Sequence, residues 1–168
     1  LKEAKEKGLI RRIGVSLYNE KDISQVLESE LKPEVIQLPM NILDTGIYRH
    51  GLLGKLFEKG IEIHVRSVFL QGLFYLSETD LEARFKDVIP FLKVLKSISA
   101  KAGVSLSELS LLWLVSLKEV SKVIIGVDNV NQLKAHLETL KKKVDSSFFE
   151  EAFAVQYENE EILNPSLW

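Results

Sequence analysis

The chain contains no cysteine, so disulfide bonds and metal sites with thiolate ligands are excluded. Histidine is also scarce, and the separation of His50, His64 and His136 matches no metal-ligand spacing, so we expect no metal site. The sequence has no signal-peptide pattern and no apolar run long enough to cross a membrane. We therefore expect no membrane partner and a cytoplasmic location.

An excess of charge of either sign is lacking as well. The chain has 22 basic and 24 acidic residues, a net charge of -2, so we expect no nucleic-acid partner. Hydrophobic residues make up 46% and charged residues 27%, which is ordinary for a globular domain. A chain of 168 residues is long enough for one domain with a core. We expect residues 1–168 to form a single domain, with residues 156–168 as a C-terminal tail.

Methionine is nearly absent, and Met40 is the only one. The chain begins with Leu1 and opens on a helical pattern over residues 1–7, which Gly8 ends as a C-cap. We expect from this that an N-terminal part of the protein is missing from the sequence.

Short runs rich in β-branched residues predict four strands, at residues 10–16, 35–38, 61–67 and 123–125. Apolar residues at helical spacing follow each of them. The predicted helices begin at Asn19 or Asp22 and run to Leu31, and then cover about residues 46–59, 91–102, 106–115, 130–140 and 146–155. Ser105 and Glu108 form a capping box that opens the fourth of these helices, which is apolar on nearly all sides.

Strand and helix therefore alternate four times, with no hairpin signal between strands, which predicts an α/β fold with a parallel sheet. The strands do not alternate between polar and apolar residues, as expected when both faces of the sheet are covered. Two architectures fit this order: a small doubly wound sheet, or part of a (β/α)8 barrel. A complete barrel takes roughly 250 residues, so four units correspond to half of one.

Polar residues follow the predicted strands where each one ends. They are Ser16, Gln37, Arg66 with Ser67, and the turn from Gly126 to Asn129. Ligands bind at this edge of parallel α/β sheets. At the last strand, a glycine turn leads into a capped helix N-terminus, which favours an anion. An ordinary strand-to-helix corner is the alternative interpretation.

Four segments together resemble the aldo/keto reductases, in the order and at the spacing of that family: residues 13–16, 36–44, 66–72 and 123–129. The ending at residues 163–168 also resembles bacterial members. The resemblance covers only the second half of the family's barrel, strands five to eight. It implies half of a TIM-type (β/α)8 barrel and an NADPH-dependent oxidoreductase that reduces aldehydes and ketones to alcohols.

The resemblance also implies roles for single residues. Ser16 and Gln37 would hydrogen-bond the nicotinamide carboxamide, and Arg66 would stack where many members have an aromatic ring. Ser67 and the backbone through Phe69 and Leu70 would hold the pyrophosphate. The turn would face the adenosine phosphate, and Gln132 would lie near the adenine ribose; the turn residues are Gly126, Val127, Asp128 and Asn129.

Some positions depart from the family pattern. Leu17 and His136 stand where many members have Asn. We find no dense Lys/Arg cluster near Gly126 for a 2′-phosphate, so NADPH rests on the resemblance and NADH stays open. No tyrosine or histidine of this chain matches the family's catalytic motifs, and no catalytic residue can be named among the 168; the tyrosines are Tyr18, Tyr48, Tyr75 and Tyr157.

Three interpretations stay open. The first is the C-terminal cofactor-binding part of an aldo/keto reductase, whose missing half supplies the catalytic acid and completes the site for a small carbonyl substrate. The second is a non-catalytic half-barrel that self-associates to cover its sheet edges and retains nucleotide affinity. The third is an α/β domain whose glycine turns have no chemical role. The sequence does not identify the carbonyl substrate; Phe69, Phe74 and Tyr75 form either an apolar wall for it or simple rim packing.

Overall fold

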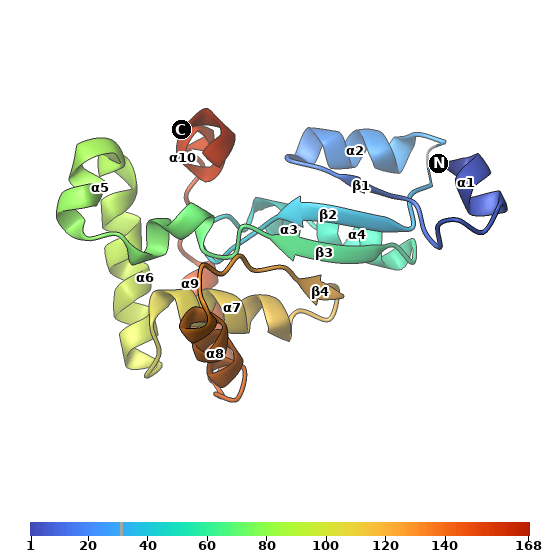
Figure 1. The fold of residues 1–168 in the computed structure, drawn as a ribbon. Helices are drawn as coiled ribbons and strands as arrows, with labels where there is room; N and C mark the ends of the chain where they lie inside the picture. Colours follow the sequence, from blue (N-terminus) through green and yellow to red (C-terminus); the bar gives the residue numbers. More distant parts are fainter. Residues whose placement is uncertain (31) are drawn as a thin grey trace.

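A computed structural model describes residues 1–30 and 32–168. Four strands form one parallel sheet in the order β1-β2-β3-β4: β1 (Gly14–Ser16), β2 (Val35–Pro39), β3 (Glu62–Arg66) and β4 (Lys122–Val123). Helices separate the strands along the chain, so the predicted α/β fold of parallel units is confirmed. The carboxyl ends of β2 and β3 point toward the side on which α5, α6 and α10 lie (Figure 1).

The helices keep most of the predicted positions. Their bounds are α1 (Lys2–Glu6), α2 (Glu20–Glu28), α3 (Gly46–Arg49), α4 (Leu52–Glu58), α5 (Glu78–Arg84), α6 (Ile89–Lys101), α7 (Leu106–Ser116), α8 (Val130–Thr139), α9 (Ser146–Phe153) and α10 (Glu160–Leu163). Three 3-10 turns join them: η1 (Leu70–Tyr75), η2 (Lys86–Val88) and η3 (Pro165–Leu167). The capping box at Ser105 and Glu108 is present, and Asn19 caps α2 as predicted. Leu31, expected at the end of that helix, lies outside the described residues.

Several bounds differ from the prediction. The helix expected over residues 46–59 is two helices, because Gly51 takes a left-handed φ of 71° between α3 and α4. β1 begins only at Gly14, and β4 ends at Val123, so Ile124 and Ile125 lie beyond the strand. The loop expected after Ser67 contains η1, and α5 follows it unpredicted.

The two faces of the sheet differ in burial. Ile36, Leu38, Ile63 and Val65 are fully buried on one face, where they pack in the core. The alternate positions of β2 and β3 face the other way, and apart from the buried Pro39 they stay partly exposed; these are Val35, Gln37, Glu62, His64 and Arg66. The expectation that both faces are covered is therefore wrong for this chain, because helices pack closely against only one of them. We call the second face the open face.

The helix α7 lies at the centre of the core. Leu109 and Leu114 are fully buried, which confirms that this helix is covered on more than one side. Within the described residues, no single helix is long and apolar enough to cross a membrane. The segment Lys86–Lys101 and α7 reach that measure only as a pair, across a bend of 77°.

The helix α8 carries its apolar stripe on the outside. Its helical spacing was predicted correctly, yet the stripe residues are between 41% and 65% exposed; they are Val130, Leu133, Leu137 and Leu140. A groove of about 380 Å³ runs between α7, β4 and α8, with Leu111, Val123 and Ile125 among its lining residues. We call the four exposed residues Val130, Leu133, Leu137 and Leu140 the α8 stripe.

Candidate functional site

Ser16 and Gln37 lie side by side where β1 and β2 end, because they are register partners in the parallel ladder. Ser16 is exposed and Gln37 is half-buried on the open face. Neither side chain has a hydrogen-bond partner among the described residues. A hydroxyl and an amide both donate and accept hydrogen bonds. The pair can therefore bind both the oxygen and the amino group of a carboxamide.

Arg66 ends β3 on the same face of the sheet. Its guanidinium lies 4.5 Å from the centre of the Tyr18 ring. Its Nη1 donates to the Ser67 hydroxyl at 3.3 Å, and its Nη2 donates to the Leu17 carbonyl at 3.5 Å. These contacts hold the side chain between the ends of β1 and β3, on the face of the sheet that also carries Gln37.

The loop after β3 has an unusual backbone. Ser67, Leu70 and Gln71 take left-handed φ angles of 61°, 46° and 52°. This conformation costs energy in a residue with a side chain, and proteins retain it where surrounding contacts enforce it, often at ligand sites. We call residues 67–71 the strained loop.

Two buried polar side chains enforce that conformation. The Asn41 amide donates to the Ser67 carbonyl at 3.2 Å, and the Ser110 hydroxyl donates to the Val68 carbonyl at 2.8 Å. In a trans peptide the N–H group points opposite to the C=O group, so the N–H groups that share a peptide with these two carbonyls, those of Val68 and Phe69, point away from Asn41 and Ser110. In the part of the chain that the structure describes, no acceptor pairs with the N–H groups of Val68 and Phe69. Such successive N–H groups suit a phosphate.

Asn41 and Ser110 were not predicted as site residues. Both are fully buried. A signal was present in the sequence, because each polar residue interrupts an apolar run, but the run alone does not say which loop the side chain reaches.

The turn into α8 is exposed from Gly126 to Asn129. The φ of Gly126 is not left-handed, and the chain bends at Asp128 and Asn129 rather than at the glycine where the turn was expected. Asn129 caps α8 by accepting from the Gln132 N–H at 3.0 Å. The first-turn N–H groups of Val130 and Asn131 have no acceptor among the described residues.

Gln132 is engaged within this turn. Its Oε1 accepts from the Asp128 N–H at 2.7 Å, and its Nε2 donates to the Asp128 carboxylate at 3.3 Å. The side chain must leave these bonds before it can contact a ribose. The Asp128 carboxylate also brings negative charge to the start of α8, where the sequence offered no cluster of cations.

Phe69 joins the strained loop to α8. Its ring stacks on that of His136 at 4.8 Å between centroids and 17° between planes. Tyr75 meets the other edge of Phe69 at 5.7 Å. The residues expected to bind a cofactor therefore form one continuous strip, from the ends of β1 and β2 across the strained loop to α8.

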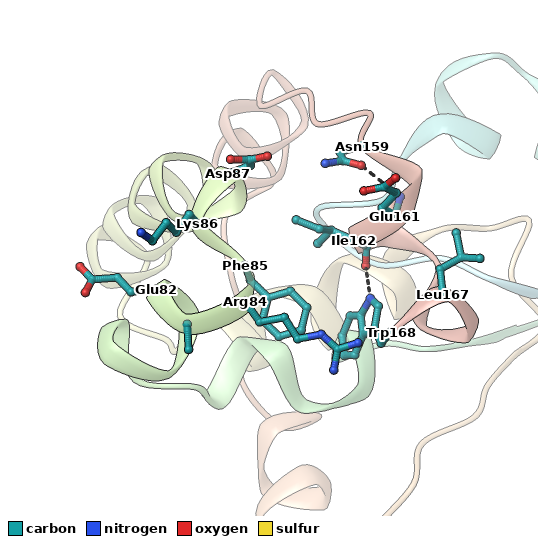
Figure 2. Close-up of a pocket in the computed structure, with 11 residues that line it drawn as sticks. Glu82, Arg84, Phe85, Lys86, Asp87, Asn159, Glu161, Ile162, Leu167 and Trp168 are labelled. Carbon is teal, nitrogen blue, oxygen red and sulfur yellow. Dashed lines mark hydrogen bonds between the residues drawn. The ribbon is translucent and has the colours of Figure 1, made fainter.

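A separate cleft lies apart from this strip. It measures about 640 Å³ and opens between α5 with η2 on one side and the tail on the other (Figure 2). Phe85 and Trp168 meet in it at 4.8 Å between ring centroids, and Trp168 donates its ring N–H to the Ile162 carbonyl at 3.1 Å. None of the expected cofactor residues line this cleft. The tail also contains α10 and η3, which the sequence did not predict.

Electrostatics at the loop after β2 are distinctive. Burial, together with the nearby carboxylates of Glu20 and Glu160, raises the pKa of Asp44 to about 7. Among the described residues, no group of three or more His, Asp or Glu side chains could hold a metal ion.

Comparisons with known proteins give a family match. The model of the Aldo/keto reductase family matches residues 1–155. A comparison with curated proteins gives no match. The aldo-keto reductase AKR11C1 from Bacillus halodurans superposes in its holo form with a TM-score of 0.74 at 23% identity, covering 94% of this chain and 56% of that chain. Its apo form gives a TM-score of 0.73 at 24% identity, with the same shares of 94% and 56%.

A third structure agrees with these. The thermostable aldo-keto reductase Tm1743, in complex with the inhibitor epalrestat, gives a TM-score of 0.68 at 22% identity, covering 92% of this chain and 52% of that chain. At this level of identity the likeness establishes the shared fold. The chain spans just over half the length of the structures it matches.

Proposed function

Because the chain belongs to the aldo/keto reductase family, we propose that it forms the C-terminal, cofactor-binding half of the barrel of an oxidoreductase that uses NADPH or NADH to reduce aldehydes and ketones to alcohols. The observation that carries this proposal is the strained loop. Its carbonyls are bound to Asn41 and Ser110, and its N–H groups at Val68 and Phe69 lack acceptors among the described residues.

The residues at the strand ends fit a nicotinamide dinucleotide. Ser16 and Gln37 offer a partnerless hydroxyl and amide to the carboxamide, with Arg66 beside the ring. The pyrophosphate is held by the strained loop, through Ser67, Phe69 and Leu70. The adenosine end lies toward α8, where the turn residues and Gln132 meet it; the turn residues are Gly126, Val127, Asp128 and Asn129. When bound, the cofactor supplies the hydride for carbonyl reduction.

We expect NADPH from the family resemblance, whereas the turn into α8 offers little for a 2′-phosphate. Asp128 is negative, and Gln132 is hydrogen-bonded to it. NADH therefore remains a second candidate cofactor.

The catalytic acid is proposed to come from a preceding half of the barrel, so the 168 residues alone are expected to bind cofactor without turnover. Two features support this. The four strands leave β1 and β4 as free edges, whereas a complete barrel has eight strands. The α8 stripe, beside the free edge of β4, is exposed and suits a covering partner. In this arrangement residues 1–168 are one domain, residues 156–168 are its tail, and the protein is cytoplasmic.

Calorimetric titration of the 168-residue chain tests the proposal. NADPH or NADH is expected to bind, and Gln37→Ala is expected to weaken binding at least tenfold because the carboxamide loses a partner. The matched control is Gln25→Ala, on the exposed side of α2. Absence of binding by both cofactors, or equal loss in both variants, would contradict the proposal.

Self-association of the half-barrel is a second candidate, which the α8 stripe and the two free sheet edges favour. Sedimentation velocity of the wild type and of a Leu133→Gln, Leu137→Gln double variant tests for self-association. A dimeric wild type and a monomeric double variant support it. A monomeric wild type eliminates it.

A further inference from the structure

The charge of Arg66 is not compensated within the described residues. Its guanidinium contacts a hydroxyl, a carbonyl and the Tyr18 ring, and no carboxylate pairs with it there. Arg12, at the opposite end of the open face, pairs instead with Glu62. A guanidinium remains protonated at any ordinary pH, so Arg66 is a permanent positive charge at the ligand edge of the sheet.

Arg66 is only partly buried, and among the described residues one aromatic ring, that of Tyr18, contacts its guanidinium. Tyr18 lies against one face at 4.5 Å, and the bonds to Ser67 and Leu17 fix the orientation of the plane. Arg66 comes two residues after His64, which is the ladder partner of Gln37, so Arg66 and Gln37 lie on the same face. A ring whose carboxamide is bound by Ser16 and Gln37 then lies beside Arg66; this step rests on the function proposed above.

The redox state of the cofactor changes the charge of that ring. The dihydronicotinamide of NADPH is neutral, and after giving up a hydride the pyridinium ring of NADP⁺ is positive. A guanidinium stacks favourably on a neutral ring, whereas two positive charges at stacking distance repel each other. We propose that Arg66 makes the site discriminate the redox state of the cofactor by charge, binding the reduced form more tightly than the oxidised form.

A preference for the reduced form changes the redox potential of the bound cofactor. A tenfold preference for the reduced form raises the midpoint potential of the bound two-electron couple by about 30 mV. Bound cofactor is then a weaker hydride donor than free cofactor, and the oxidised product dissociates more readily.

The test is a set of calorimetric titrations of the 168-residue chain with NADPH, NADP⁺ and 2′-phospho-ADP-ribose, which lacks the nicotinamide. In the wild type, the Kd for NADP⁺ is expected to exceed that for NADPH at least tenfold. Arg66→Met should lower this ratio at least fivefold, and Arg66→Lys should retain most of it. Arg11→Met is the matched control, because Arg11 is an exposed cation before β1, at the other end of the strands. Thermal melting confirms that each variant is folded.

The outcomes separate this inference from the proposed function. If both cofactors bind with the same ratio in the wild type and Arg66→Met, the inference is wrong and the proposed function stands. If Arg66→Met weakens NADPH, NADP⁺ and 2′-phospho-ADP-ribose equally, Arg66 binds phosphate and the inference is again wrong. If none of the three ligands binds, the inference is wrong for this protein. If NADH also fails to bind, the proposed function fails with it.

Discussion

Asp44 should make the stability of this protein fall as the pH rises toward neutrality. Burial raises the pKa of its carboxyl from 3.8 to about 7, and Glu20 and Glu160 add repulsion. Among the described residues, no donor binds the carboxyl group itself; the hydrogen bonds of Asp44 are those of its backbone N–H and C=O groups with Asn41. Ionised Asp44 is therefore an uncompensated negative charge beside two others, and Asp44→Asn removes that charge while keeping the shape.

The size of the effect follows from linkage. Between about pH 4 and pH 7 the folded chain holds a proton that the unfolded chain has released. The stabilisation is fully present below the unfolded pKa and is lost as the pH rises through about 7. The free energy of unfolding should fall by up to about 1.4 kcal/mol per pH unit in this range, with about 4 kcal/mol as an upper limit overall.

Urea unfolding at pH 5, 6, 7 and 8 measures this change. Asp44→Asn should be more stable than the wild type by about 1.5 kcal/mol at pH 5, and this difference should widen toward an upper limit of about 4 kcal/mol at pH 8. Asp145→Asn is the control, because Asp145 is exposed and its bonds to Ser147 lower its pKa, so its variant should gain nothing at high pH. Parallel stability curves for the wild type and Asp44→Asn would refute the assignment.

Two further predictions concern packing around the site. Gly14→Ala should destabilise by about 1–3 kcal/mol, because its Cβ would lie 2.7 Å from the Val35 carbonyl oxygen and force β1 from β2. At Gly54, in α4, an added Cβ would meet no atom within 4 Å, so Gly54→Ala should instead stabilise the fold by about 0.5–1 kcal/mol. Urea midpoints that shift in the same direction for both variants would contradict this account. Ser110→Ala should cost about 1–3 kcal/mol and weaken NADPH binding, because the Ile42 N–H and the Val68 carbonyl lose their partner. The Ser99 hydroxyl donates only to the Lys96 carbonyl of its own helix, so Ser99→Ala should leave the Kd for NADPH unchanged. Equal losses of affinity in the two variants would show that Ser110 does not act on NADPH binding through the strained loop.

Local signals in the sequence were sufficient for much of the fold. Ser105 with Glu108, Asn19 and Asn129 cap helices because their side chains reach N–H groups only three residues away. The length of the strand at Val123 was overestimated: the Ile124 N–H still donates to the Val65 carbonyl of β3 at 2.7 Å, but the ladder with β3 ends at Val123. The helix α5 was not predicted because it is short and lacks an apolar stripe. Its N-cap residue Ser77 lies in a segment that was predicted to be a loop.

Prediction of the site depended on which contacts are local. Ser16, Gln37 and Arg66 follow strands, and the parallel ladder places them on one edge, as the sequence order implied. Asn41 and Ser110 act on the strained loop across 26 and 42 residues of sequence, and no local pattern encodes such a distance. The pairing of Gln132 with Asp128 is local but competes with the ribose contact expected from the family.

The open face shows why the carboxyl edge is the ligand edge. At its amino end, Glu62 accepts from three side chains: it pairs with Arg12, bonds to His64 Nε2 at 2.7 Å and contacts Lys122 Nζ at 3.1 Å. Burial, with Lys122 and Arg12 nearby, lowers the pKa of His64, and the polar side chains of this cluster have partners within it. Two residues further along β3, Arg66 has no such partner within the described chain, and the free groups of the strained loop follow it. Polar groups satisfied at one end and unsatisfied at the other point to a polar, negatively charged ligand at the second end, independently of any sequence motif.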